Sequence, residues 1–392
     1  MKRGCAICGG IQKRVLHPQR FVSLDDAAVL VGYDVVVCER CGFGFADDVP
    51  DQAQLDRYYE EMSKYENQDR AGAVDAPTLQ TYREIADTLK AHFPDKGGRI
   101  LDAGCATGGL LNELKHLGYQ NVMGLDPSPA CVHIAQKAFG IKVLQGSLVV
   151  PPPLGGTFDL LIVNSVLEHL SDLRRALHNF QNIVSDGGLV WIEVPDVTRF
   201  SDFLMSPYQQ FSIEHINFFS KRSLSALFGL FGFECVASFQ NVRGLGGTKD
   251  PALSCIFRKG VPAEEPLQWD GRDEAALKAY VEASRLLNER VTSGVAVVVE
   301  TKEPIIVWGV GTHTLRLLAE GTLAKANMVA FVDSNPHYQG RTLMGIPVLS
   351  PGELSSMPNR ILISSRVFQE AIREQIRDRL GLQNEVITLY ED

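Results

Sequence analysis

The sequence lacks long apolar runs, an excess of basic residues and internal repeats. No apolar run approaches the roughly 18 residues that a membrane-spanning helix needs, so we expect no contact with the membrane interior. No apolar stretch follows Lys2 and Arg3, so we expect no secretory signal and a cytoplasmic protein. The net charge of −9 argues against nucleic acid as the main partner, because phosphate-binding surfaces normally carry a basic excess.

The composition is that of a globular protein with several domains. The chain has 392 residues, of which 45% are hydrophobic and 22% are charged, and this length predicts two or three domains. We place them at residues 1–75, 76–257 and 258–392, because a Pro-, Gly- and charge-rich stretch at 258–271 is typical of a linker.

Apolar strands alternate with amphipathic helices in the second and third segments. A helix is predicted from Pro77 to His92, and strands are predicted at RILDAG, NVMGLD, FDLLIVNSV and GLVWIEVP. Near-continuous apolar strands between helices indicate an α/β fold with a parallel sheet that helices cover on both faces. A second βα series follows a helix expected near residues 272–292.

Four of the eight cysteines form two CxxC pairs near the N-terminus, Cys5–Cys8 and Cys38–Cys41. Each pair can wrap around one ion, and four thiolates complete a closed tetrahedral zinc site. Such a site has no open position for a substrate, so the zinc would be structural. The alternatives are four unconnected thiols or a redox CxxC, although the βαβ context of a redox motif is absent.

A glycine turn follows the first strand of the second segment, in the pattern Asp102-x-Gly104-x-x-x-Gly108. This pattern differs from the G-x-G-x-x-G fingerprint that brings a helix N-terminus against a pyrophosphate, because position 106 is alanine. A ligand without phosphates needs such a turn where the backbone passes close to it. Asp102 is placed to accept an ammonium group of that ligand.

Polar residues at neighbouring strand ends complete the expected cofactor site. Asp126 ends the next strand and can accept two ribose hydroxyls, or cap the helix that follows. Asn164 ends a later strand at the same sheet edge, and Ser147 follows the run IKVLQ, where it could cover an adenine. Together these residues predict binding of S-adenosylmethionine. The alternatives are another nucleotide ligand or an empty fold.

Two Glu-His pairs are candidates for acid–base chemistry. Glu214-His215 lies in the aromatic segment SPYQQFSIEHINFFS, and a histidine suits proton removal near neutral pH. The rival pair Glu168-His169 directly follows a strand of the cofactor domain, where it could line the pocket or cap a helix. A packed histidine beside a surface glutamate is the alternative for His215.

The third segment carries a second, degenerate glycine turn. Gly309 and Gly311 begin it, Thr314 takes the place of the third glycine, and Asp333 follows 22 residues after Gly311. The turn could bind NAD, help to hold a phosphorylated or nucleotide-linked substrate, or be purely structural.

These motifs resemble one family over essentially the whole chain: the sugar C-methyltransferases that act on nucleotide-linked 4-keto deoxysugars. Its members have an N-terminal four-cysteine zinc domain, a central S-adenosylmethionine domain and a C-terminal Rossmann-like domain. Their Glu-His pair, followed by an aromatic residue and Phe-Ser, corresponds here to the segment from Glu214 to Ser220.

The resemblance implies roles for particular residues. His215 would be the base that removes the proton next to the ketone, beside Glu214, and Tyr65 is the best match to an active-site tyrosine, ahead of Tyr58 and Tyr59. The acceptor would be a nucleotide-linked sugar. The family tyrosine two residues before the glutamate is Ser212 here. Methylation of oxygen, or a non-catalytic sugar- or protein-binding role, therefore stays open beside C-methylation.

Overall fold

The computed structural model describes residues 2–24, 30–61, 74–245, 248–261, 269 and 271–390. Contacts divide the chain into two compact units, each assembled from several stretches of sequence. The first comprises Met1–Arg14, Val36–Arg199 and Glu214–Ala276, and the second Val15–Val35, Phe200–Ile213 and Leu277–Asp392. Both cysteine pairs belong to the first unit.

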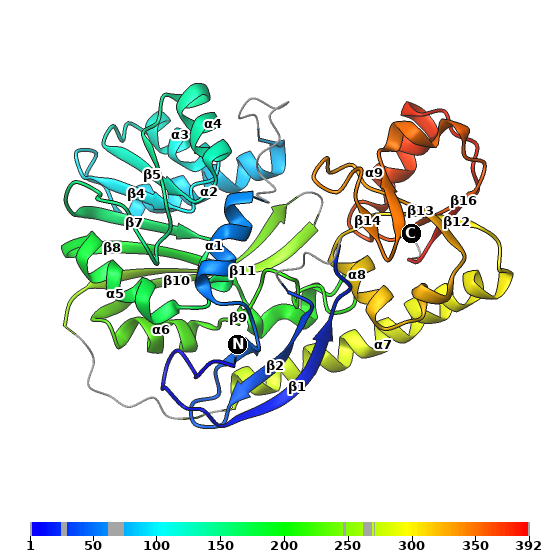
Figure 1. Ribbon diagram of the computed structural model, residues 1–392. Helices are drawn as coiled ribbons and strands as arrows, with labels where there is room; N and C mark the ends of the chain where they lie inside the picture. Colours follow the sequence, from blue (N-terminus) through cyan, green and yellow to red (C-terminus); the bar gives the residue numbers. More distant parts are fainter. Residues whose placement is uncertain are drawn as a thin grey trace. The chain divides into compact units, whose positions relative to one another are not determined.

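The first unit is built on a seven-stranded sheet within the described part of the chain, in the order β10-β11-β8-β7-β4-β5-β6 (Figure 1). Its strands are β4 (Ile100–Ala103), β5 (Val122–Asp126), β6 (Val143–Gln145), β7 (Phe158–Asn164), β8 (Val184–Pro195), β10 (Phe233–Leu245) and β11 (Thr248–Lys259). The predicted parallel sheet is confirmed from β6 to β8. The β10–β11 hairpin, which pairs antiparallel with β8, was not predicted.

Helices cover both faces of this sheet, as the sequence predicts. Residues of α2, α3 and α4 share one buried core with the sheet, and those of α5 and α6 share the other. The helices of this unit are α1 (Gln52–Glu61), α2 (Ala76–His92), α3 (Gly109–His116), α4 (Pro129–Phe139), α5 (Leu173–Ile183) and α6 (Lys221–Gly229). Helix α2 begins where the carboxylate of Asp75 accepts the Thr78 N–H at 2.8 Å, which satisfies one of the free donors of its first turn.

The cysteine-bearing segment packs against the α5 and α6 side of the sheet. Cys5, Cys38 and Cys41 belong to the same buried core as α5 and α6. Strand β3 (Gly44–Asp47) pairs antiparallel with β9 (Asn217–Phe218) and so joins this segment to the chain just after Glu214-His215. Strands β1 (Lys13–Arg20) and β2 (Gly32–Cys38) extend the sheet, in the order β1-β2-β3-β9.

The second unit contains the other βα series. Its six-stranded sheet, counted over the described residues, has the order β14-β15-β13-β12-β16-β17. The strands are β12 (Ile305–Trp308), β13 (Met328–Val332), β14 (Thr342–Leu343), β15 (Ile346–Leu349), β16 (Arg360–Ile363) and β17 (Val386–Thr388). Helices α8 (Thr312–Ala319) and α9 (Gln369–Glu374) belong to it, as do the residues of α7 (Arg272–Thr301) from Leu277 onward; α7 is longer than predicted.

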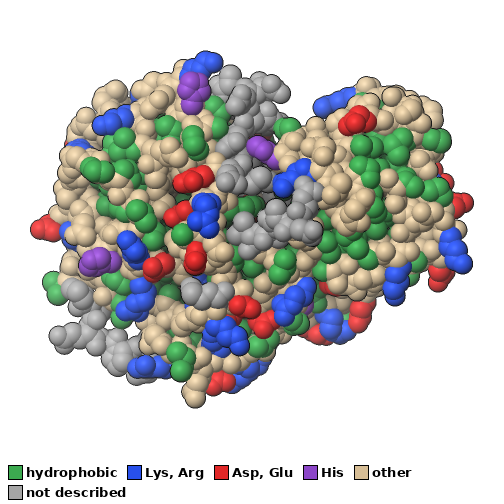
Figure 2. Space-filling view, in the orientation of Figure 1, with side chains coloured by type: hydrophobic (Ala, Val, Ile, Leu, Met, Phe, Trp, Pro, Cys, Tyr) green, Lys and Arg blue, Asp and Glu red, His purple; other side chains and the backbone are tan. Residues whose placement is uncertain are grey.

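Two further observations concern surface charge and the apolar character of the helices. On the face shown in Figure 2, Lys and Arg side chains are mixed with Asp and Glu side chains. Among the described helices, none combines the length and the apolar character needed to cross a membrane.

Candidate functional site

The glycine turn after β4 is shaped for close approach to a ligand. Gly104 has φ +82°, and a Cβ there would lie 2.4 Å from Cγ2 of Val166, so this position excludes every side chain. Gly108 also has positive φ and forms the N-cap of α3. Strand β4 lies between β5 and β7, where the chain changes direction across the sheet. Ligands of open α/β sheets bind at the carboxyl edge of such a switch point.

Asp126 ties the glycine turn to the end of β5. One carboxylate oxygen accepts the Ala106 N–H at 2.8 Å, and the other accepts the Ser128 N–H at 3.0 Å. Ser128 in turn caps α4, so Asp126 supports that helix start indirectly. A carboxylate has about four acceptor sites, so two hydroxyl groups of a ligand could still bind.

Asp102 lies buried behind the turn, and its Oδ1 atom has no hydrogen-bond partner among the described residues. Burial, and then repulsion from Asp126, raises the pKa of the Asp102 carboxyl to about 8. A buried oxygen of this kind is costly unless a donor or a cation reaches it. The residues therefore fit a ligand that carries an ammonium group.

A pocket with about 870 Å³ of empty space, part of it open to solvent, lies at this edge of the first unit. Its lining residues include Gly104, Ala106, Asp126, Ser147, Ser165, Val166, His169, Tyr59 and Glu214. The glycine turn and members of both Glu-His pairs thus face one cavity.

Two residues predicted for the cofactor site differ in their placement. Ser147 lines the pocket, as the sequence suggests. Asn164 is not among the lining residues; its side-chain oxygen lies 3.4 Å from the indole nitrogen of Trp191. The next residues, Ser165 and Val166, line the pocket instead, because β7 ends at Asn164 and the chain then turns.

The two Glu-His pairs, which the sequence presents as rivals, form a single cluster. The His169 and His215 rings lie 5.0 Å apart, and Nδ1 of His169 lies 3.0 Å from the Glu214 carbonyl oxygen. The Glu214 carboxylate accepts the Tyr58 hydroxyl at 3.3 Å. The edge of Tyr59 faces His169. Tyr65 lies outside the described residues.

Backbone hydrogen bonds hold the two pairs together. The Ile216 N–H donates to the Glu168 carbonyl at 2.8 Å. The amide of Asn217 donates to the carbonyls of Leu167 and Leu170, each at 2.8 Å. Sequence analysis missed Asn217, although its position two residues after His215 in the aromatic segment was a signal.

The four N-terminal cysteines converge as predicted. Sγ of Cys5 lies 3.4 Å from Sγ of Cys41, and the same distance separates Cys8 and Cys38. In a tetrahedral site with zinc–sulfur bonds of about 2.3 Å the sulfurs are about 3.8 Å apart. Hydrogen bonds from Cys41 and then Cys5 hold the pKa of the Cys38 thiol well below its usual range. These residues could bind zinc, and no fifth group is needed.

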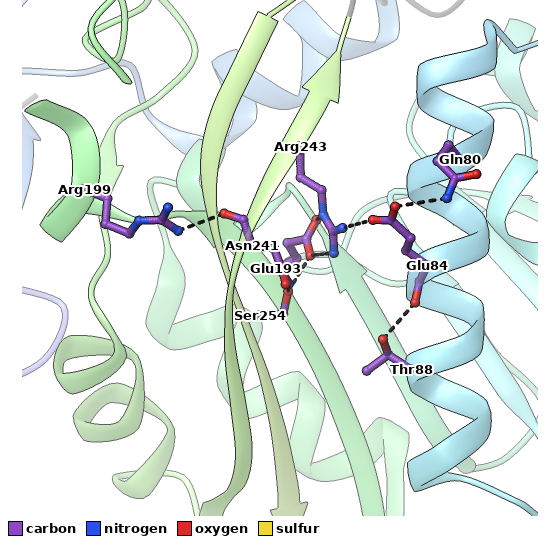
Figure 3. Close-up of polar contacts among 8 residues, drawn as sticks. All are labelled: Gln80, Glu84, Thr88, Glu193, Arg199, Asn241, Arg243 and Ser254. Atoms are coloured by element: carbon purple, nitrogen blue, oxygen red, sulfur yellow. Dashed lines mark hydrogen bonds and ion pairs between the residues drawn. The ribbon is translucent and has the colours of Figure 1, made fainter. Parts of the chain in front are cut away.

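A buried ion pair between Arg243 of β10 and Glu193 of β8 supports the wall of the pocket (Figure 3). The Arg243 guanidinium makes two hydrogen bonds to the Glu193 carboxylate, at 2.9 and 2.7 Å, and a third to Glu84 of α2 at 2.9 Å. The Glu193 carbonyl accepts the Ser165 N–H at 2.8 Å. The pair therefore fixes the part of β8 that holds a lining residue of the pocket.

The second unit repeats the geometry of the Asp126 turn. Asp333 accepts the Val310 N–H at 2.7 Å and the Asn335 N–H at 2.8 Å. Burial raises the pKa of Asp333. The Thr314 hydroxyl, in the place of the third glycine, donates to the Gly309 carbonyl at 2.7 Å. Threonine thus closes the turn from within.

Comparison with known protein families finds a match for the central part of the chain. Residues 78–238 match the family described as Methyltransferase domain. These residues form a methyltransferase domain. It contains the glycine turn, Asp126 and both Glu-His pairs, whereas the cysteine pairs lie outside it. Residues 301–388 match a different family, described as C2185-like, N-terminal.

Curated relatives match between about a quarter and a half of this chain. The chain is 33% identical over 120 residues to the protein named Ubiquinone biosynthesis O-methyltransferase of Azorhizobium caulinodans, covering 27% of this chain and 47% of that protein. It thus spans about half the length of that relative. It is 24% identical over 190 residues to Uncharacterized protein MJ1123 of Methanocaldococcus jannaschii, covering 48% and 84% of the two chains.

Solved structures superpose on about half of the chain. Magnesium protoporphyrin IX methyltransferase from Synechocystis PCC 6803, with bound SAH, gives a TM-score of 0.41 at 16% identity and covers 54% of this chain and 100% of that one. The [4+2]-cyclase SpnF gives a TM-score of 0.42 at 15% identity and covers 54% and 97%.

Proposed function

We propose that the chain is an S-adenosylmethionine-dependent methyltransferase that methylates a carbon of a nucleotide-linked keto sugar, with His215 as the general base. One observation carries the proposal: His169 and Glu214 line the same pocket as the glycine turn, and the His215 ring, which is not itself a lining residue, lies 5.0 Å from the His169 ring. Asp126 would bind the ribose hydroxyls, Asp102 the ammonium group, and Ser147 would lie over the adenine. Gly104 lets the backbone approach the amino acid part of the cofactor.

The chain's own residues would organise the transfer. The bound cofactor supplies an electrophilic methyl group on a sulfonium. His215 would take the proton from the carbon next to the ketone, and the electron pair left there forms the new carbon–carbon bond as the sulfur–methyl bond breaks. Glu214, held by Tyr58, would orient the acceptor or the imidazole.

Methylation of an oxygen atom is the second candidate. The relative from Azorhizobium caulinodans is named as an O-methyltransferase. In this case His215 would deprotonate a hydroxyl group, and the cofactor site would be unchanged.

Deuterated water separates the two candidates. A thermal-shift screen of nucleotide sugars, with S-adenosylhomocysteine present, identifies an acceptor. Proton removal next to the ketone then exchanges that proton for deuterium, whereas O-methylation leaves it in place. His215→Ala should abolish the exchange and lower turnover by about 10²–10⁴-fold. Near-normal turnover of this variant would refute the assignment of the base, and His169 would be the next candidate.

A further inference from the structure

Three potential metal ligands, one carboxylate and two imidazoles, converge beside the pocket. They form a second cluster, apart from the four cysteines. One ligand atom each from Glu168, His169 and His215 lies within 4.8 Å of the others. The Glu168 side chain is 1% exposed, and its Oε1 lies 3.8 Å from Nε2 of His169. His169 also lines the pocket, so this cluster has a side that faces the cavity.

The hydrogen bond at the far side of His169 selects the tautomer that can bind a metal. Its Nδ1 lies 3.0 Å from the Glu214 carbonyl oxygen, which can only accept. Nδ1 must therefore carry the hydrogen, and in the neutral ring the lone pair lies on Nε2, the atom that faces Glu168. Metal-binding histidines are held in this way by an outer carbonyl or carboxylate.

We propose that Glu168, His169 and His215 bind one divalent transition-metal ion of the zinc class. Two imidazoles and one carboxylate suit zinc, manganese, iron, cobalt or nickel better than magnesium or calcium, which prefer oxygen ligands alone. Ligand atoms about 2.0–2.1 Å from a tetrahedral ion lie about 3.3–3.4 Å apart. The three groups therefore need to close by at most about 1.5 Å, and they leave one tetrahedral position for a water molecule.

A metal ion bound at this site would prevent His215 from acting as a general base. A nitrogen lone pair that binds a metal cannot also accept a proton, so the ion blocks the base. This consequence rests on the proposed function. Binding of the ion does not, because it needs neither the cofactor nor the acceptor. The site is thus an inhibitory metal site superimposed on the acid–base cluster.

Cobalt titration of the full chain tests the binding. Co²⁺ in the four-cysteine site gives thiolate charge-transfer absorption, whereas Co²⁺ bound by nitrogen and oxygen gives only weak visible bands. After the zinc has been removed from the full chain, we expect it to take up two equivalents of cobalt, the second without thiolate bands. Glu168→Gln and His169→Ala should each lose the second equivalent and keep the first, whose spectrum also shows that the fold is intact.

Matched variants control for ordinary surface binding. Glu113 and His116 of α3 form a Glu–His pair with a separation of 3.4 Å, outside the pocket, and the His116 side chain is 67% exposed. Glu113→Gln and His116→Ala should retain both equivalents. Uptake of only one equivalent by the wild-type chain, or a second equivalent that survives in Glu168→Gln and His169→Ala, overturns the site.

Activity is measured separately once an acceptor is known. Added Zn²⁺ should inhibit turnover by at least tenfold at saturation, and a mild chelator should restore it. Binding at the site with unchanged turnover would leave the metal site in place but contradict His215 as the base.

Discussion

The guanidinium of Arg3 donates to the side-chain oxygen of Asn217 at 2.9 Å, across 214 positions of sequence. It also donates to the Ile216 carbonyl, one residue after His215. Asn217 in turn donates to the carbonyls on either side of Glu168-His169. A residue two positions before the first cysteine thus holds the backbone of both Glu-His pairs. The cysteine-bearing segment therefore supports the acid–base cluster.

Replacement of Arg3 should disturb the cluster without touching the cofactor. Arg3→Ala removes charged hydrogen bonds that are each worth about 1.5–3 kcal/mol, so we expect a loss of about 2–4 kcal/mol in the free energy of unfolding and slower turnover. Urea denaturation and steady-state kinetics measure the two effects. Cofactor affinity should change little. A variant with normal stability and turnover would show that the hydrogen bonds of Arg3 do not support the Glu-His cluster.

Loss of one cysteine should release the zinc. Cys38→Ser removes a thiolate from a closed four-sulfur site, and structural zinc sites contribute several kcal/mol to folding. We expect metal analysis to find about one zinc per chain fewer in the variant than in the wild type, because the separate site at Glu168, His169 and His215 is the same in both. The N-terminal segment of the variant should also be cut faster by protease. Cys131→Ser, at a buried cysteine outside the site, should keep the zinc. Equal zinc content in wild type and Cys38→Ser would contradict the site.

The carboxyl of Asp102 should make stability depend on pH. Its pKa of about 8 in the folded protein lies above the value of about 3.9 expected in an unfolded chain. The folded state therefore binds more protons between these values, and stability falls as pH rises from about 4 to 8.

Asp102→Asn should remove this dependence. The variant should melt at a higher temperature than the wild type near pH 8, yet bind S-adenosylmethionine at least about tenfold more weakly. Melting curves between pH 5 and 8 measure the first effect. Asp87→Asn, at an exposed position of α2, should behave like the wild type. Parallel pH profiles for wild type and Asp102→Asn would refute this interpretation.

The ion pair between Arg243 and Glu193 should be costly to break from one side. Arg243→Ala leaves a buried carboxylate without its cation, which typically costs about 3–5 kcal/mol of stability. Chemical denaturation measures this loss, and because Glu193 also holds Ser165, cofactor affinity should fall too. Arg285→Ala, which breaks an exposed pair on α7, should have little effect. Equal stability of the two variants would contradict the role of the buried pair.

Local spacing made part of this architecture predictable. The two CxxC pairs, the glycine turn and Asp126 are encoded by short motifs whose geometry follows from a few neighbouring residues. The helix expected from Pro77 to His92 begins one residue earlier, at Ala76, because Asp75 is its cap.

Contacts between distant residues were not predictable in the same way. Arg3 belongs to no motif, and its hydrogen bond to Asn217 depends on how β3 pairs with β9. Glu168-His169 and Glu214-His215 were treated as rivals because the sequence does not show that Ile216 pairs with Glu168. Arg243 and Glu193 likewise meet only through the unpredicted β10–β11 hairpin.

Calorimetric titration of S-adenosylmethionine into the full chain tests the central claim most directly. We predict one binding site per chain, and an affinity that falls by about 1.5–3 kcal/mol, or roughly 10- to 150-fold, in Asp126→Ala, because the ribose loses its charged acceptor. Asp87→Ala is the matched control and should bind as the wild type does. The absence of binding to the wild-type chain, or equal affinity of Asp126→Ala, would contradict the account.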